Sequence, residues 1–217
     1  MNPPLRAGII GSTGLVGSEC IRALLDSGRY SKVFSASRRP LSEVPSLRSV
    51  LPHPSVEEVE WGEPSEMPAV EHLFCSLGTT RRKAGSRAGF REIDHDLPLR
   101  WARWAKDVGA RHLALVSSIG ANARSRLFYT RTKGMLEDAV RELDFPSLTI
   151  LRPSVIGGAR EEFRLGESLS QLLGTLAPRG YRTIPATVIA SAMVAAALRE
   201  APGTRVVESG DIWTLAL

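Results

Sequence analysis

The chain has 217 residues, enough for one well-buried core but short for two full domains. Its 28 Lys and Arg against 23 Asp and Glu give a net charge of +5. Without a recognised DNA- or RNA-binding motif, this excess predicts a surface for phosphorylated ligands rather than for nucleic acid.

No apolar stretch reaches the roughly 18 to 20 residues of a membrane span, and residues 1–6 lack a hydrophobic secretory core. Cys20 and Cys75 both lie in apolar surroundings, which predicts buried free thiols and no disulfide. We therefore expect one domain over residues 1–217, located in the cytoplasm, with no membrane and no nucleic-acid partner.

Strand-like apolar runs alternate with helical patterns along the chain. We expect strands at residues 5–10, 33–37, 56–61, 72–77, 112–118 and 148–153. We expect helices at residues 14–27, 90–108, 126–143 and 187–200. This alternation predicts an α/β fold: a single doubly wound, Rossmann-type parallel sheet with helices on both faces.

Three intervals depart from the regular pattern. Residues 47–51 compete with 56–61 for the third strand, and residues 62–71 contain Pro64 and Pro68, which predict a turn or a short helical piece. After Pro153 the pattern is irregular through Gly180. We expect a small C-terminal substrate-side lobe or lid there, at about residues 155–185.

A glycine-rich turn follows the first expected strand. Its glycines are three apart, which allows a tight turn and a close approach of backbone N–H groups to phosphates at the start of a helix. This pattern predicts a pyrophosphate site formed by Gly11, Ser12, Thr13, Gly14, Leu15, Val16 and Gly17.

Tyr129 and Lys133 stand four residues apart on an expected helix, so both project from one face. A neighbouring ammonium lowers the pKa of a phenol from about 10 toward values useful in acid–base catalysis. The helix follows a strand that ends in Ser117 and Ser118. These residues are candidates for a catalytic group.

Together these features resemble the short-chain dehydrogenase/reductase superfamily, and in particular its atypical branch of Tat-interactive-protein oxidoreductase-like proteins. The segments that carry the resemblance are residues 75–85, 117–121, Phe128-Tyr129, Lys133-Gly134, Arg152-Pro153 and the spaced charges Arg160, Glu162, Arg164 and Glu167.

The resemblance implies roles for the candidate residues. Tyr129 is the proton donor or acceptor, Lys133 binds the nicotinamide ribose and tunes the tyrosine, and Ser118 hydrogen-bonds the substrate oxygen, with Ser117 as the alternative hydroxyl. Further cofactor-binding residues are Leu77, Gly78, Thr79, Thr80, Ser117, Tyr129, Lys133, Pro153 and Val155. Where many members of the superfamily have an Asn, this chain has Asp94, which puts an Asn-based proton relay in doubt.

The second expected strand ends in Ser37-Arg38-Arg39. No acid is available there for the ribose hydroxyl of NAD, whereas Arg38 and Arg39 suit a 2′-phosphate. We therefore expect NADP (NADPH) rather than NAD. Because Gly11, Thr79 and Pro153 also lie at the carboxyl ends of expected strands, the ligand is expected along that edge.

Other residues receive no catalytic role. The four histidines have no ligand spacing, and consecutive residues of the Asp94-His95-Asp96 run do not share a helical face, so no metal site is expected. Trp101 and Trp104 predict a packing stripe or a subunit contact. A homodimer therefore remains open.

The leading hypothesis is an NADP-dependent oxidoreductase that acts on a small carbonyl or alcohol substrate. A non-enzymatic NADPH-binding regulator would need neither Tyr129 nor Lys133 for chemistry. A nucleotide-sugar epimerase-like enzyme shares the motifs, but about 65 residues after Pro153 are few for its usual substrate domain.

Overall fold

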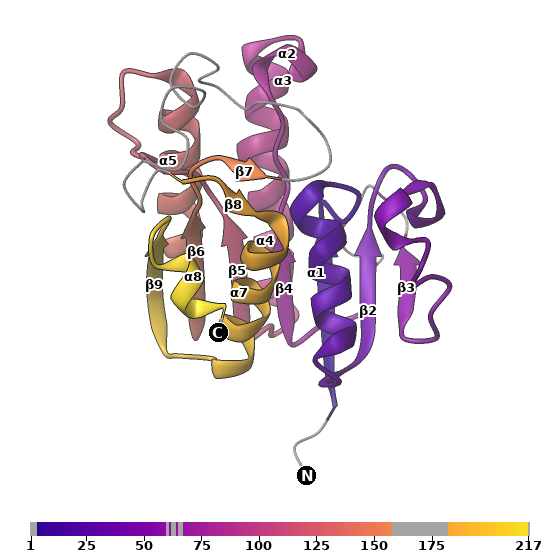
Figure 1. The fold of residues 1–217 in the computed structure, drawn as a ribbon. Helices are drawn as coiled ribbons and strands as arrows, with labels where there is room; N and C mark the ends of the chain where they lie inside the picture. The colour runs from indigo at the N-terminus through magenta and orange to yellow at the C-terminus, as the bar shows by residue number, and fades with distance from the viewer. Residues whose placement is uncertain (1–3, 60, 62–63, 65–66, 158–181, 217) are drawn as a thin grey trace.

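The computed structural model describes residues 4–59, 61, 64, 67–157 and 182–216. Seven parallel strands form one sheet in the order β3-β2-β1-β4-β5-β6-β9 (Figure 1). The strands are β1 (Leu5–Ile10), β2 (Tyr30–Ala36), β3 (Val56–Val59), β4 (His72–Cys75), β5 (His112–Val116), β6 (Ser147–Arg152) and β9 (Gly203–Glu208). The expected Rossmann-type α/β fold is confirmed.

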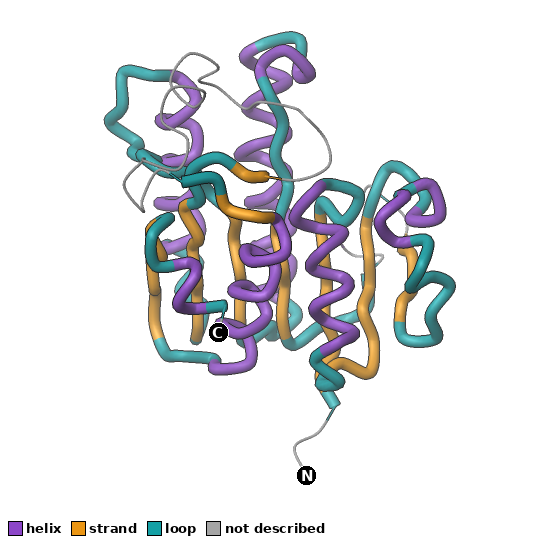
Figure 2. The backbone as a smooth tube through the Cα atoms, in the orientation of Figure 1, coloured by secondary structure: helices purple, strands orange, loops and turns teal. Residues whose placement is uncertain are grey.

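Helices cover both faces of the sheet (Figure 2). One apolar cluster joins α1, α7 and α8 to the sheet, and a second joins α4 and α5 to its other face. The helices are α1 (Leu15–Asp26), α2 (Arg81–Ala84), α3 (Arg87–Arg91), α4 (Leu97–Asp107), α5 (Phe128–Arg141), α7 (Ala186–Arg199) and α8 (Ile212–Leu215). No helix in these ranges is both long and apolar enough to cross a membrane.

The expected helix at residues 90–108 is divided by a π-helical segment, Glu92–Asp96. Pro98 follows it and cannot donate an N–H to the carbonyl of Asp94, so a regular α-helical ladder would be interrupted at this point. The widened turn precedes α4 and turns the side chain of Asp94 into the interior, where it is fully buried.

Other differences have local causes. β9 was not expected from the sequence, because it is an edge strand of which only Val207 is buried. Residues 47–51 do not form the third strand, since two short 3₁₀ turns, Leu41–Glu43 and Pro45–Leu47, precede β3. Of the interval 62–71, the residues described include Pro64 in a helical turn.

Most of the expected substrate-side lobe, with the charges at 160–167, lies outside the described residues. Its two flanks are described: β7 (Ile156–Gly157) pairs in parallel with β8 (Ile184–Pro185). This small sheet brings the two ends of the segment together beside the carboxyl end of β6 (Figure 1).

The cysteines and tryptophans lie where packing requires them. Cys20 and Cys75 are free and buried, as expected, and burial raises the pKa of the Cys75 thiol to about 11. Trp101 is fully buried, and its ring packs against Trp61 and Trp104, which confirms the packing stripe.

A buried cluster of titratable groups lies at the amino-terminal edge of the sheet. The Tyr30 hydroxyl contacts His72 Nδ1 at 2.8 Å, and His72 Nε2 lies 2.9 Å from Glu200 Oε1. The His112 ring lies 5.8 Å from that of His72. Burial lowers the pKa of both imidazoles, that of His112 to about 3.

This cluster predicts a loss of stability in acid. Histidine has an ordinary pKa of 6.5, so below that pH the unfolded chain takes up protons that the folded protein resists. The contribution of this cluster to the free energy of unfolding is therefore fully present above pH 6.5, and it is lost as the pH falls toward 3. Urea unfolding at a series of pH values should show a smaller decrease for His112→Gln. The variant His53→Gln, outside the cluster, should behave like the wild type; an equal decrease in all three proteins would contradict this explanation.

Candidate functional site

The candidate residues meet along the carboxyl edge of the sheet. The chain order reverses between β1 and β4, which is where open α/β sheets leave a crevice for a ligand. The segments that follow β1, β2, β4, β5 and β6 contain all of the residues expected from the sequence. The sheet itself brings these segments close together, because the carboxyl ends of parallel strands lie at the same edge.

The glycine turn is as tight as the motif requires. Gly11 has φ +82°, and a Cβ there would lie 2.7 Å from the carbonyl carbon of Ser76. A Cβ on Gly17 would lie 2.1 Å from the Gly11 oxygen. Neither position can accept a side chain, so the turn packs directly on the segment after β4 and α1 packs directly on the turn.

The first turn of α1 can receive an anion. Gly14 is its N-cap residue and supplies no side-chain hydrogen bond, and the first N–H groups of a helix have no partner within it. These N–H groups and the positive end of the helix dipole fit a phosphate group. The side chains of Ser12 and Val16 are buried, and Ser12 Oγ accepts a hydrogen bond of 2.7 Å from Ser35. These two residues therefore offer only their backbone.

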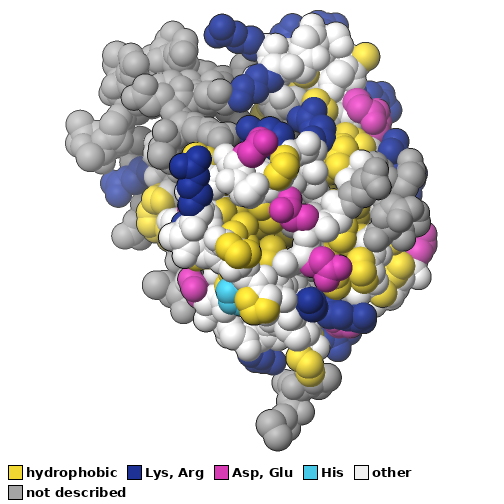
Figure 3. Space-filling model, turned by 90° about the vertical axis from the view of Figure 1, so that its right-hand side faces the viewer, with side chains coloured by type: hydrophobic (Ala, Val, Ile, Leu, Met, Phe, Trp, Pro, Cys, Tyr) yellow, Lys and Arg dark blue, Asp and Glu magenta, His cyan; other side chains and the backbone are white. Residues whose placement is uncertain are grey.

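Arg38 and Arg39 are exposed after β2, beside an open groove of about 430 Å³. The groove is lined by Ser37, Arg38, Arg39, Pro40, Glu58, Val59 and Trp61. Figure 3 views the molecule from the β3 side, and Lys and Arg side chains gather toward its upper end, the side of the carboxyl edge.

Glu58 corrects one expectation. No acid follows the second strand in the sequence, but β3 pairs with β2 so that Glu58 lies opposite Ser35 and lines the same groove. One oxygen of its carboxylate accepts the Leu41 N–H at 2.8 Å. The sequence offered one indication of this neighbour: the expected third strand contains two acids in succession, Glu57 and Glu58.

The segment after β4 is held by side chains on both sides. Ser76 Oγ donates to the carbonyl of Ile10 at 3.2 Å. The Thr79 N–H donates to Asp94 Oδ2 at 2.8 Å, and Thr80 caps α2 by accepting the Lys83 N–H. Leu77, Gly78, Thr79 and Thr80 thus form a fixed strip of backbone across the edge from the glycine turn.

Helix α5 carries the expected Tyr129 and Lys133 one turn apart. The Phe90 ring lies 5.6 Å from that of Tyr129, which fixes the phenol against α3. Lys133 is buried with 3% of its side chain exposed, and its ammonium lies 2.8 Å from Asp94 Oδ1. A Cβ on Gly134 would lie 2.2 Å from the backbone of Asn122, so the segment after β5 lies directly on this helix.

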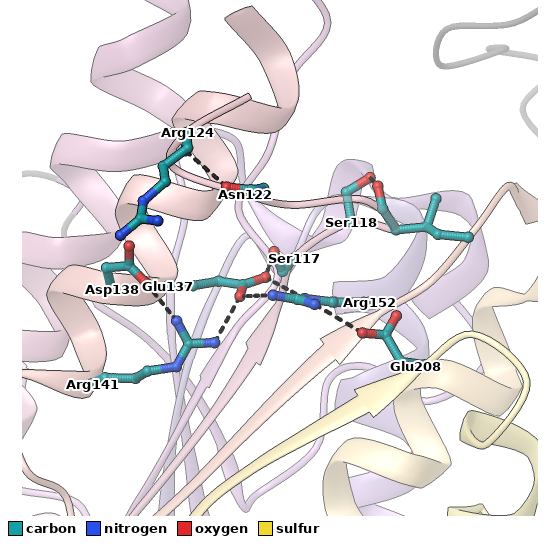
Figure 4. A network of polar contacts seen from close by, with 10 residues as sticks. Ser117, Ser118, Asn122, Arg124, Glu137, Asp138, Arg141, Arg152 and Glu208 are labelled. Carbon is teal, nitrogen blue, oxygen red and sulfur yellow. Dashed lines mark hydrogen bonds and ion pairs between the residues drawn. The ribbon is translucent and has the colours of Figure 1, made fainter. Parts of the chain in front are cut away.

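One turn further along α5, Glu137 is the centre of a buried polar network (Figure 4). Its carboxylate accepts two hydrogen bonds from Arg152, from Nε at 2.9 Å and from a terminal nitrogen at 2.5 Å. Arg141 also donates to it, at 2.9 Å. The hydrogen bonds that Arg152 donates to Glu137 raise the pKa of its guanidinium.

This network separates the two candidate serines. The hydroxyl of Ser117 donates to Glu137 Oε1 at 2.5 Å, so it is already engaged in this hydrogen-bond network. The hydroxyl of Ser118 makes only a long contact of 3.4 Å, with the carbonyl of Ile119. Of the two, Ser118 is the one that can turn to a ligand.

The remaining candidates lie after β6. The carbonyl of Pro153 accepts the Ile119 N–H at 2.9 Å, and that of Val155 accepts the Ile184 N–H at 2.8 Å. Pro153 is thus fixed beside the segment after β5, and Val155 is fixed beside β8. Within the described ranges no group of three or more His, Cys, Asp or Glu side chains could hold a metal ion. Asp94 and His95 turn to different partners, Lys133 and Asp96.

Similar proteins are known for most of the chain. The protein named FMP52, mitochondrial, of Debaryomyces hansenii is 33% identical over 207 residues, which cover 93% of this chain and 90% of that protein. The protein of the same name from Coccidioides immitis is 35% identical over 215 residues, 90% of this chain and 87% of that protein. No protein-family model matches the chain.

Solved structures share the fold. The enzyme WbmF of Bordetella bronchiseptica, in complex with NAD⁺ and UDP, superimposes with a TM-score of 0.71 at 15% sequence identity. The superposition covers 97% of this chain and 75% of that enzyme. At this identity the likeness establishes the Rossmann-type α/β fold alone and leaves the reaction open.

The relatives correct the expected location. The cytoplasmic location is contradicted, because relatives that match 90% or more of this chain are named mitochondrial proteins. The absence of a hydrophobic secretory core in residues 1–6 is evidence about export alone. It does not distinguish the cytoplasm from an organelle.

The network around Glu137 predicts a large effect of its removal. Glu137→Gln removes the buried charge that Arg141 and Arg152 share and leaves Arg152 only its exposed partner Glu208. Breaking one side of a buried pair costs about 3 to 5 kcal/mol of unfolding free energy. Asp138 is the matched control: it is the next residue, 59% of its side chain is exposed, and it pairs with Arg141 on the surface. Asp138→Asn should cost less than about 1 kcal/mol. Chemical unfolding of both variants measures these losses of unfolding free energy, and equal losses would contradict the role assigned to Glu137.

Proposed function

The chain belongs to the FMP52 family, and from this premise we propose that it is an NADP-dependent oxidoreductase of the atypical short-chain dehydrogenase/reductase type, with a small carbonyl or alcohol substrate. The observation that carries the proposal is the placement of α5. It holds Tyr129 and buried Lys133 at the same sheet edge as the uncapped first turn of α1.

The site fits a dinucleotide along its length. The backbone of residues 11–17 would hold the pyrophosphate, and the groove at Arg38 would hold the adenosine. Leu77 to Thr80 and Pro153 with Val155 would border the nicotinamide. The resemblance to the Tat-interactive-protein oxidoreductase-like branch supports these assignments, and the complex of WbmF with NAD⁺ supports the cofactor class.

Each catalytic candidate has a distinct role in this proposal. The nicotinamide, when bound, supplies or accepts the hydride. Ser118 hydrogen-bonds the substrate oxygen, and Tyr129 gives it a proton in reduction or takes one in oxidation. By the resemblance, Lys133 holds the ribose and tunes the phenol for proton transfer. A hydroxyl pair and a nearby cation stabilise the charge that develops on this oxygen.

The nucleotide-sugar alternative shares the motifs and stays a second candidate. A non-enzymatic NADPH-binding regulator would keep Lys133 for the ribose alone, and the second experiment below separates it from an enzyme.

We expect NADPH to bind at least about tenfold more tightly than NADH, because charge-assisted bonds to a 2′-phosphate are worth more than about 1.4 kcal/mol. Arg38→Ala and Arg39→Ala should reduce this preference. Arg29→Ala, exposed just before β2 at the opposite edge, should not. Calorimetric titration with both nucleotides measures the effect, and equal affinities in the wild type would refute the assignment.

Tyr129→Phe removes one oxygen and should lower turnover of any carbonyl substrate about 10²-fold or more, the usual contribution of positioned acid–base catalysis. NADPH affinity should change little, whereas Lys133→Ala should reduce both. NADPH oxidation with short aldehydes, ketones and quinones is the readout. Activity that survives Tyr129→Phe contradicts the catalytic role, and tight NADPH binding without turnover of any substrate favours the regulator.

A further inference from the structure

Two stretches of the sequence, residues 72–91 and residues 108–136, contain no Asp or Glu. Their basic residues are Arg81, Arg82, Lys83, Arg87 and Arg91 in the first stretch and Arg111, Arg124, Arg126, Arg131 and Lys133 in the second. Protein surfaces usually mix both signs of charge, and a surface of one sign attracts ligands of the opposite sign. The chain therefore concentrates positive charge in two stretches.

The fold brings parts of these two stretches together at the carboxyl edge of the sheet. The first stretch continues from β4 into α2 and α3, and the second continues from β5 into α5 (Figure 1). The Phe90 ring on α3 lies 5.6 Å from the Phe128 ring on α5 and 5.6 Å from the Tyr129 ring. These three rings join the two stretches beside a catalytic candidate.

Two arginines are held at the Phe128 ring, one from each stretch. The guanidinium carbon of Arg87 lies 5.5 Å from the ring centre, and that of Arg131 lies 6.0 Å from it. Arg131 also donates to the carbonyl of Ser125 at 3.0 Å. An aromatic ring attracts a cation but has no net charge, so both guanidinium groups keep their positive charge. Neither forms an ion pair with a carboxylate of the described residues.

The phosphates of the proposed cofactor do not account for these two arginines. The proposed pyrophosphate site follows β1, and the proposed site of the 2′-phosphate follows β2. By contrast, α3 and α5 follow β4 and β5, on the other side of the point where the chain order reverses. The arginines at Phe128 thus lie on the side of Tyr129, where the substrate is expected to react.

We propose that the substrate carries an oxyanion group, a phosphate or a carboxylate, which binds at Arg87 and Arg131 while its reacting oxygen lies at Tyr129. The proposal rests on the proposed function and names the substrate class for that same site: an anionic carbonyl or alcohol compound. Guanidinium groups suit this class because they donate paired, charge-assisted hydrogen bonds to phosphate and carboxylate oxygens. The surrounding positive charge also increases the rate at which an anion reaches this edge.

A binding experiment tests the site without turnover. Glycerol 3-phosphate and glycerol form a matched pair of probes, because they differ in the phosphate group alone. Each is added to ¹⁵N-labelled protein with excess NADP⁺, which occupies the proposed cofactor site and keeps the probe from the glycine turn. We expect glycerol 3-phosphate to shift the amide NMR signals of residues 86–91 and 126–131, whereas glycerol leaves them unchanged.

Variants assign this binding to the two arginines. Arg87→Ala and Arg131→Ala should each weaken the binding of glycerol 3-phosphate about tenfold, because each removes a charged hydrogen-bond donor. Arg87→Lys keeps the positive charge and should retain more affinity than Arg87→Ala. Arg103→Ala is the matched control, since Arg103 is exposed on α4, outside both stretches. Equal binding of the two probes, or equal weakening by Arg103→Ala, would overturn the proposal.

A kinetic experiment compares two pairs of carbonyl compounds with NADPH. Glyceraldehyde 3-phosphate against glyceraldehyde tests the phosphate, and succinic semialdehyde against butanal tests the carboxylate. We expect the charged member of at least one pair to have a kcat/KM at least about tenfold higher, through a lower KM. Added salt should raise the KM of the charged member alone. No advantage of the charged member in either pair would contradict the assigned substrate class.

These experiments can fail separately from the proposed function. If NADPH reduces neutral carbonyl compounds in a reaction that needs Tyr129, but the anionic probes have no advantage, the oxidoreductase assignment stands and the substrate class falls. If glycerol 3-phosphate binds at Arg87 and Arg131 while no carbonyl compound is reduced, the anion site stands and the reaction proposed for it falls.

Discussion

Two buried charges one turn apart on α5 fix this helix against its neighbours. Lys133 faces Asp94 on one side, and Glu137 faces Arg152 at the end of β6 on the other. Because a buried charge without a partner costs several kcal/mol, each pair permits little displacement of the helix. Tyr129, the serines after β5 and the segment after β4 all take their positions from this one helix.

Polar contacts also tie the neighbouring segments of this edge to α5. The Glu137 network reaches Ser117, so the segment that presents Ser118 is tied to α5 by a hydrogen bond. Asp94 ties the segment after β4 to α5 in the same way. On the other side of the crevice the glycine turn needs no side chains, since Gly11 and Gly17 pack backbone against backbone.

Much of this architecture can be predicted from the sequence, because apolar periodicity reports burial directly. The residues of β1 were predicted to the residue, and those of α1, α5 and α7 to within a few residues. Features that depend on partners distant in sequence could not be predicted. β9 is exposed along most of its length, and Glu58 reaches the groove through strand pairing. Asp94 is buried between Thr79 and Lys133, which come from other segments of the chain.

The proposed dinucleotide extends along the carboxyl edge, from the groove beside β2 to α5. A crystal structure of the protein with bound NADPH tests this placement most directly. We expect the pyrophosphate at the first turn of α1, the 2′-phosphate at Arg38 and Arg39, and the nicotinamide beside Tyr129. A nucleotide bound away from residues 11–17, or with its nicotinamide turned away from α5, would contradict it.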